Sequence, residues 1–136
     1  MQLKVSTDYA IRIVLYMAEE QRILSSRELS DRLNIPQSIV LKITKILCKN
    51  SIVEIHMGKN GGFALSKKPA DISLLDVIEL METTMKINRC LEKDCFCSRH
   101  AAKDCPVRHF YCSMQQQMEQ MLKMTTIDDM IKSRRA

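Results

Sequence analysis

The chain has 136 residues, which is enough for one compact domain or for a small domain with an extension. Hydrophobic residues make up 46% and charged residues 27% of it, as in ordinary globular proteins, and no apolar run reaches the length of a membrane span. The apolar stretch at 9–18 is interrupted by Arg12 and is followed by no small-residue cleavage site, which argues against a signal peptide. We therefore expect a cytoplasmic protein that does not associate with membranes.

Positive charge is concentrated in the first half of the chain. The formal net charge is +5, and residues 1–70 hold 11 Lys and Arg against 6 Asp and Glu, whereas residues 71–136 hold 10 of each. Basic solvated surfaces are common in proteins, so the charge alone identifies no partner. Its asymmetry is nevertheless typical of a module that faces a phosphate backbone.

Two short helices are predicted before residue 35. Apolar residues recur at helical spacing over 9–18 and predict the first helix, which Ser6 can cap. Ser25 and Glu28 have the spacing of a capping box and predict the start of a second helix there. Pro36 follows a short turn and is suited to the start of a third helix.

The third predicted helix, at about 37–49, has two different faces. One face is apolar and carries Ile39, Ile43, Ile46 and Leu47. The other face is polar and carries Ser38, Lys42, Lys45 and Lys49. Cys48 lies beside the apolar face and is interpreted as a small core residue. Such a distribution predicts a helix with one buried and one exposed side.

A β-hairpin is predicted after the third helix. Residues 52–57 alternate apolar and polar side chains, residues 58–62 are rich in glycine, and residues 63–65 form an apolar return. Asn60-Gly61 between two apolar runs is a strong hairpin signal. Two helices, a turn, a third helix and a hairpin follow the order of a winged helix-turn-helix, which we place at residues 1–70.

In this arrangement the third helix enters the major groove of DNA. Gln37 and Ser38, at its N-terminal end, are expected to contact base edges or nearby phosphates. Three lysines are expected to contact phosphates, which fix position without specifying sequence: Lys42, Lys45 and Lys49. Lys59 at the hairpin tip is expected to reach the backbone or the minor groove. Taken alone, an exposed Ser/Lys helix face is usually only solvated, so the surrounding motif carries this interpretation.

The second half, residues 71–136, is predicted to hold a linker helix, a loop and a long helix. Ser73 and Asp76 begin the linker helix, and 84–105 shows no convincing periodicity. Pro106 opens a helix that extends to about 124, with apolar residues at the 4-3-4-3 spacing of coiled coils: Val107, Tyr111, Met114, Met118 and Met121. The predicted fold class is therefore mainly α with a small β-hairpin wing and a long C-terminal dimerisation helix.

Five of the six cysteines lie close together in this second half: Cys90, Cys95, Cys97, Cys105 and Cys112. Without an export signal, thiols stay reduced, and clustered cysteines bind metal or respond to oxidation. Thiolates suit iron–sulfur clusters and zinc, although the paired C-x2-C of a zinc ribbon is absent. The sequence also lacks a C-x-x-C in a βαβ setting, a Ser/His/Asp pattern and a phosphate loop, so we expect no enzyme.

Three segments together resemble the Rrf-two family of winged-helix transcriptional regulators: 28–36, 58–65 and 72–79. The resemblance extends over essentially the whole chain. It implies a homodimer, crossed through the long C-terminal helix, that binds a pseudo-palindromic operator in double-stranded DNA. It also implies a regulator, expected to be a repressor, that senses redox state, nitric oxide or iron status through an iron–sulfur cluster, 2Fe-2S or 4Fe-4S.

The same resemblance implies the cluster ligands. Family members with a cluster use three cysteines, the last just before the long helix, which points to Cys90, Cys97 and Cys105. Cys95 is the alternative middle ligand, because the gap from Cys97 to Cys105 is longer than usual. The fourth ligand is expected to be Asp8 of the other subunit, with His109 as the alternative. A regulator of the same fold controlled by zinc, thiol oxidation or a protein partner is the alternative function.

Overall fold

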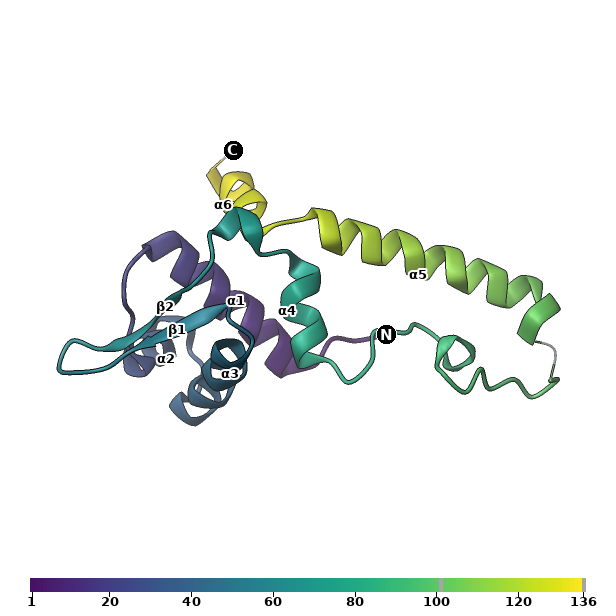
Figure 1. Ribbon diagram of the computed structural model, residues 1–136, viewed down its shortest axis with the longest axis horizontal. Helices are drawn as coiled ribbons and strands as arrows, with labels where there is room; N and C mark the ends of the chain where they lie inside the picture. The colour runs from purple at the N-terminus through teal and green to yellow at the C-terminus, as the bar shows by residue number, and fades with distance from the viewer. Residues whose placement is uncertain (101, 136) are drawn as a thin grey trace.

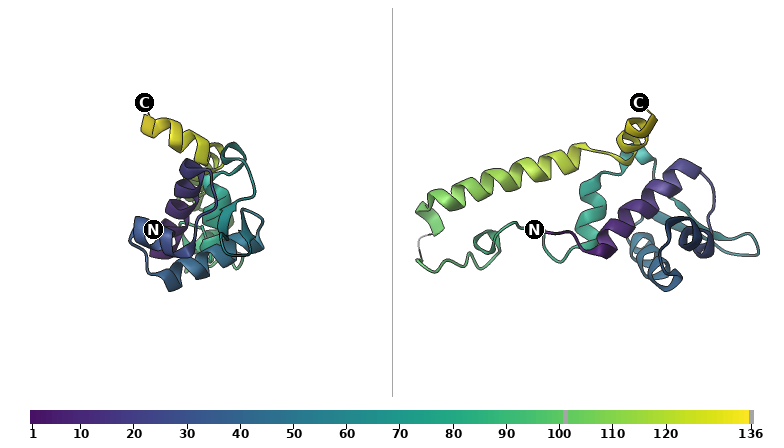
Figure 2. Two further views of the ribbon diagram at one scale, coloured as in Figure 1. Left: turned by 90° about the vertical axis from the view of Figure 1, so that its left-hand side faces the viewer. Right: turned by 180° about the vertical axis from the view of Figure 1, so that it is seen from behind.

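The computed structural model describes residues 1–100 and 102–135, which form a body and a protruding arm (Figure 1). The body consists of α1 (Val5–Glu20), α2 (Ser26–Leu33), α3 (Gln37–Lys49), β1 (Val53–His56), β2 (Gly62–Leu65), α4 (Leu74–Met81) and α6 (Ile127–Arg135). The arm consists of α5 (Pro106–Met124) and of the segment that runs back beside it, as Figure 2 also shows. Single turns of 3-10 helix lie at η1 (Pro69–Asp71), η2 (Arg89–Leu91) and η3 (Ala102–Asp104).

The predicted capping of the first helix is wrong, and that of the second is half right. Lys4, not Ser6, is the N-cap of α1 and has no side-chain capping bond. Ser25 caps α2 as expected, because its Oγ accepts a hydrogen bond of 3.1 Å from the Glu28 N–H. The Glu28 carboxylate pairs instead with the Arg22 guanidinium, which lowers the pKa of Glu28. The second bond of a capping box is therefore replaced by an ion pair.

The hairpin is present, but its turn differs from the one that Asn-Gly predicts. β1 and β2 are antiparallel, with Val53 opposite Leu65, and the Gly61 N–H donates to the Gly58 carbonyl at 3.1 Å. The two central residues of the turn are therefore Lys59 and Asn60. A Cβ on Gly61 would lie 2.1 Å from the His56 carbonyl oxygen, so a glycine is needed there for the close approach of two backbones.

The alternating residues of β1 do not form one buried face. Val53 is buried, but Ile55 is 55% exposed, and Met57 beyond the strand is more exposed still. The inner end of the hairpin is held by Leu24, whose backbone exchanges two hydrogen bonds of 2.8 Å with Phe63. Only the base of the wing therefore packs on the core, while its tip extends into solvent.

The hydrophobic core contains residues from both halves of the chain. Its first-half members include Ile13, Val14, Leu29, Ile43 and Leu47. Its second-half members include Ile72, Val77, Ile127 and Ile131. The core thus continues across residue 70, because α4 and α6 both pack on α1. No helix in the described part of the chain is long and apolar enough to cross a membrane.

The arm leaves the body after α4 and returns to it beside the start of α4. The Leu74 N–H donates to the Thr125 carbonyl at 2.9 Å, and the Ile127 N–H donates to the Ile72 carbonyl at 2.9 Å. These two bonds join the strand-like segments before α4 and after α5. The returning end of the arm, which we call its root, is therefore fixed to the body. At the end where the arm leaves, Lys4 donates hydrogen bonds to the side chains of Glu82 and Thr83.

The apolar stripe predicted along α5 is divided between two faces. Tyr111 and Met118 are half-buried toward the rest of the chain, whereas three other members are exposed: Val107, Met114 and Met121. Phe110 and Met124 extend this exposed set at helical spacing. We call the five exposed residues the outer face of α5. It has no partner within the described chain that would bury it.

Candidate functional site

The predicted recognition residues share the exposed side of α3. Ser38 and three lysines are exposed there: Lys42, Lys45 and Lys49. The opposite side of α3 is buried through Val40, Ile43, Thr44 and Leu47, which fixes the orientation of the helix on the core. The Gln37 Nε2 donates a 3.0 Å hydrogen bond to the Ser26 Oγ, so the N-terminal end of α3 is tied to α2.

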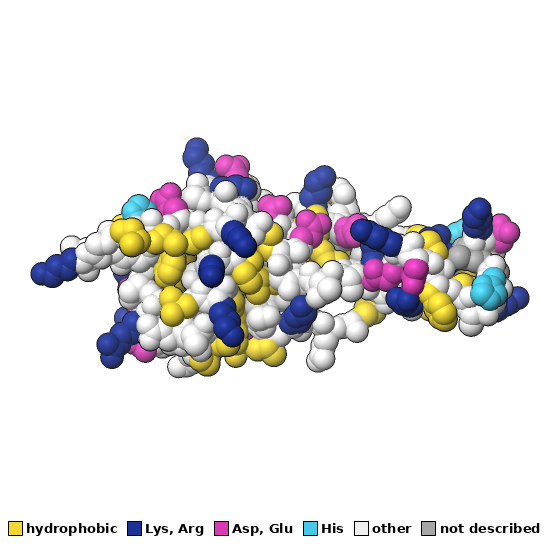
Figure 3. Space-filling model, turned by 60° about the horizontal axis from the view of Figure 1, so that its bottom comes forward, with side chains coloured by type: hydrophobic (Ala, Val, Ile, Leu, Met, Phe, Trp, Pro, Cys, Tyr) yellow, Lys and Arg dark blue, Asp and Glu magenta, His cyan; other side chains and the backbone are white. Residues whose placement is uncertain are grey.

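Lys59 is exposed at the turn of the wing, as expected. The wing and α3 both reach the face drawn in Figure 3, where basic side chains stand out over the body and at the wing tip. Over the body, acidic side chains lie mainly along its upper edge, and others lie on the arm. This distribution can attract a polyanion without close like-charge repulsion.

Leu41 is a candidate contact residue that the sequence prediction missed. It is 46% exposed and lies one turn from both Ser38 and Lys45 on the exposed side of α3. An aliphatic side chain in the major groove can contact the methyl group of thymine. The sequence could have indicated this contact, because Leu41 is an apolar residue at a helix position where the pattern predicts a polar one.

Three cysteines from separate parts of the arm line one cavity of about 330 Å³: Cys90, Cys97 and Cys105. Cys90 lies in η2, and Cys105 is the N-cap of α5. The Asn88 Nδ2 donates to the Cys90 Sγ at 3.2 Å, and the Arg108 Nε donates to the Cys90 carbonyl at 3.3 Å. The cavity therefore gathers the three cysteines that the sequence analysis preferred.

Cationic and aromatic side chains complete this cavity. Arg89 and Arg108 line it, together with Phe96 and Tyr111. The Arg89 guanidinium carbon lies 5.7 Å from the centre of the Phe96 ring, and Arg89 also pairs with Asp94. Positive side chains near thiolates offset the negative charge that a thiolate ligand set concentrates.

The donor set fits a group larger than a single ion. In the described residues no three His, Cys, Asp or Glu side chains lie close enough to hold one metal ion. In a 4Fe-4S cluster each cysteine sulfur binds a different iron, so these sulfurs lie farther apart than the ligands of one ion. Three thiols around one cavity, with cationic neighbours, are compatible with such a cluster.

The other predicted ligands lie elsewhere. Cys95 is exposed and lines a neighbouring hollow together with His100. His109 is exposed on α5 and does not line the cavity. Asp8 is exposed in α1, where its carboxylate pairs with the Arg12 Nε at 2.9 Å. Asp8 does not line the cavity of its own chain, and its role across a dimer stays a prediction.

Cys48 and Cys95 are expected to differ strongly in reactivity. Cys48 is half-buried in α3 and burial raises the pKa of its thiol, whereas Cys95 is exposed in the loop. Because the thiolate is the nucleophile, iodoacetamide should modify Cys48 at least about tenfold more slowly than Cys95. Peptide mass spectrometry of the metal-free native protein measures both rates. Equal rates in the native protein would contradict the core position of Cys48, and unfolding in denaturant provides the control.

Comparison with known proteins agrees with this geometry. The model of the Rrf2 (Rrf-two) family, described as "Iron-dependent Transcriptional regulator", matches residues 3–133. The chain is 30% identical over 96 residues to the HTH-type transcriptional regulator NsrR of Shouchella clausii (strain KSM-K16), covering 69% of this chain and 64% of that protein.

Solved structures of low sequence identity share the fold. The structure of IscR from T. potens has a TM-score of 0.77 at 18% identity, over 98% of this chain and 88% of that one. The structure of CymR, the global cysteine regulator of B. subtilis, has a TM-score of 0.81 at 18% identity, over 98% of both chains.

A helix-turn-helix, a hairpin wing and a basic exposed side of the third helix define a winged-helix DNA-binding protein. The family model covers nearly the whole chain. The chain belongs to the Rrf2 family. It is accordingly a DNA-binding transcriptional regulator and not an enzyme.

Proposed function

We propose that the chain is a homodimeric repressor whose operator binding is controlled by an iron–sulfur cluster bound to Cys90, Cys97 and Cys105. The observation that supports this most directly is the common cavity of these three cysteines at the junction of the loop and α5. A bound cluster would supply a centre that reacts with oxidants or nitric oxide. Asp8 of the other subunit is the proposed fourth ligand.

The residues of this chain would couple the cavity to DNA binding through the arm. Cys90 belongs to the loop and Cys105 to the start of α5, so drawing them together fixes the loop against the helix. The root of the arm is tied to the body that carries α3. A change in loop order can thereby alter the spacing of two recognition helices. The energy required is modest, since a tenfold change in operator affinity corresponds to about 1.4 kcal/mol.

The dimer is proposed to form through the outer face of α5. Met121 is 65% exposed, and its neighbours on this face are also large and apolar. A helix stripe of this kind is expected to be covered by a second copy in a coiled-coil-like seam. The two α3 helices would then bind the two half-sites of a pseudo-palindromic operator.

A second candidate is a regulator of the same fold without a cluster. It is favoured by the likeness to the cysteine regulator CymR, which extends over 98% of both chains. Control would then come from zinc, from thiol oxidation or from a protein partner. Iron and sulfide analysis after anaerobic purification distinguishes the two, since only the first candidate contains both elements and absorbs visible light near 400 nm.

Lys45→Ala is expected to weaken binding to all duplexes by a similar factor. The lysine is exposed on α3, so it is placed to displace a counterion from a phosphate. Because the proposed dimer loses one phosphate contact in each subunit, the slope of log affinity against log salt should decrease by about two. Fluorescence anisotropy with labelled duplexes at several salt concentrations measures both effects.

Leu41→Gln provides the contrasting variant, because it retains every lysine of this surface. Its salt slope should match that of the original protein, while the preferred bases in a random-duplex selection change. An unchanged salt slope in Lys45→Ala would exclude a phosphate contact at that position.

A further inference from the structure

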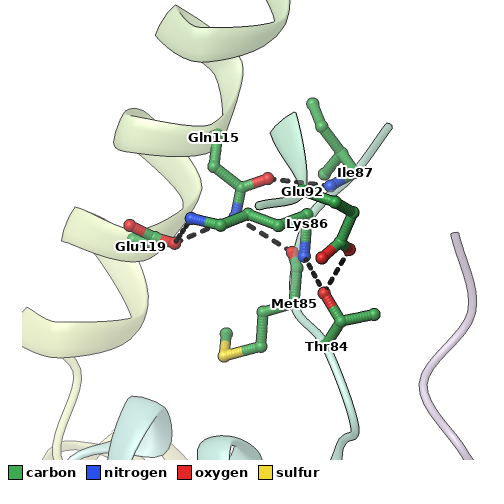
Figure 4. A network of polar contacts seen from close by, with 7 residues as sticks. All are labelled: Thr84, Met85, Lys86, Ile87, Glu92, Gln115 and Glu119. Carbon is green, nitrogen blue, oxygen red and sulfur yellow. Dashed lines mark hydrogen bonds and ion pairs between the residues drawn. The ribbon is translucent and has the colours of Figure 1, made fainter. Parts of the chain in front are cut away.

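A buried polar residue lies in the middle of the arm. Gln115 is 4% exposed and is the buried residue of α5 within the described chain. Its side chain faces the start of the cysteine loop (Figure 4). Burying an amide costs free energy unless its hydrogen bonds are satisfied, so the partners of Gln115 indicate what it does.

The Gln115 side chain binds the backbone of the loop at two residues. The Ile87 N–H donates to the Gln115 Oε1 at 2.8 Å, and the Gln115 Nε2 donates to the Met85 carbonyl at 2.9 Å. The side-chain amide therefore bonds one backbone N–H and one backbone carbonyl of loop residues two positions apart, as the backbone of a neighbouring β-strand would. Its remaining hydrogen-bonding capacity goes to the Glu119 carboxylate, at 3.0 Å from Nε2.

Further polar contacts stabilise the same short segment. The Lys86 Nζ lies 3.7 Å from the Glu119 carboxylate, which also accepts the hydrogen bond from Gln115. The Thr84 Oγ1 accepts from the Lys86 N–H at 3.1 Å and donates to the Glu92 carboxylate at 2.5 Å. The start of the loop thus has a defined conformation on α5 that uses no cysteine.

We propose that Gln115 is a positioning residue that fixes residues 85–87 on α5 and thereby sets where Cys90 enters the cavity. Cys90 follows Ile87 by three residues, so it cannot move far while Ile87 stays bound. Arg108 lies two turns before Gln115 on α5, and its Nε donates a hydrogen bond to the Cys90 carbonyl. The effect on Cys90 rests on the proposed cluster function, whereas the fixing of residues 85–87 does not.

The test replaces Gln115 with a residue of similar length that forms no hydrogen bonds. In metal-free Gln115→Met, the Ile87 amide should exchange with deuterium about tenfold faster or more, because its acceptor is lost. Gln116→Met is the matched control, since Gln116 is the exposed neighbour on the same helix. The Ile127 amide, bonded to Ile72 in the body, should exchange at the original rate in both variants and reports that the fold is intact.

A purely space-filling role for Gln115 predicts no change at Ile87 in Gln115→Met, and that result would overturn the proposal. Gln115→Glu supplies a second variant that retains an acceptor for Ile87 but loses the donor to Met85 and to Glu119 and places a second carboxylate beside Glu119. Its Ile87 exchange rate should lie between those of the original protein and Gln115→Met.

Iron release from the reconstituted protein tests the second half of the proposal. With a chelator in excess, Gln115→Met should lose iron at least about tenfold faster than Gln116→Met, because Cys90 is no longer held in place. Faster exchange at Ile87 with unchanged iron release would limit Gln115 to shaping the loop. If the original protein binds no iron, the cluster proposal fails, while the exchange experiment still decides the fixing of residues 85–87.

Discussion

Met121→Lys is expected to convert the protein into monomers and to lower operator affinity by at least about a hundredfold. Two linked DNA-binding domains bind more tightly than one by at least this factor. Met121 is 65% exposed near the C-terminal end of the outer face of α5, and the described part of its own chain leaves it uncovered there. In a symmetric seam each helix contributes this residue, so the substitution places two ammonium groups in an apolar contact. Burying a charge without a partner is strongly destabilising.

Sedimentation analysis at micromolar concentration measures the oligomeric state, and a gel-shift titration on one operator measures the affinity. Gln116→Lys introduces the same charge on another side of α5, where the side chain is exposed, and should remain dimeric. A dimer that survives Met121→Lys would place the interface elsewhere. A monomeric original protein at this concentration would rule out the proposed dimer altogether.

The boundaries of α3 and α5 were predicted correctly because their signals are local. Each has a proline at or next to its start and a sustained helical pattern. The capping box of Ser73 and Asp76 was likewise confirmed, with bonds of 3.0 Å in both directions. Such features depend on residues within one turn, so neighbouring sequence is enough to determine them.

Features that depend on distant contacts could not be predicted in this way. Periodicity marks Tyr111 and Met118 as apolar, but it does not say that the loop and the body cover them inside the chain. Gln115 and the exposed Gln116 are the same residue type on the same helix, so the sequence does not distinguish them. Only the contact with the backbone of residues 85–87 buries Gln115. α6 reaches the core because Ser73 and Thr126, 53 residues apart, pair at the root of the arm.

The choice between Cys95 and Cys97 illustrates the same limit. Their spacings to the neighbouring cysteines left both open, since they are two residues apart in an irregular loop. In the structure Cys95 has a φ of +48°, in the left-handed region, and its N–H closes a turn onto the Glu92 carbonyl at 2.9 Å. The turn directs Cys95 to a neighbouring hollow, whereas Cys97 also lines the cavity of Cys90 and Cys105.

Single Ala substitutions at Cys90, Cys97 and Cys105 are each expected to abolish iron and sulfide binding. The three thiols line one cavity, and loss of any one leaves too few thiolates to hold a cluster there. Cys95→Ala and Cys112→Ala are the matched controls, because neither residue lines that cavity, and both should retain iron. Iron and sulfide are measured chemically after anaerobic purification, together with visible absorbance.

Operator affinity completes this prediction, because the proposed cluster must also change DNA binding. The three iron-free variants should bind the operator alike and should no longer respond to nitric oxide, whereas the Cys95 and Cys112 variants should respond as the original protein does. Iron loss in Cys95→Ala but not in Cys97→Ala would move the middle ligand to Cys95 and leave the sensor proposal in place. If all five cysteines of the arm can be replaced without changing iron content or operator affinity, the sensor proposal fails. The winged-helix surface would then act under the control of another signal, since neither α3 nor the wing depends on those cysteines for its packing.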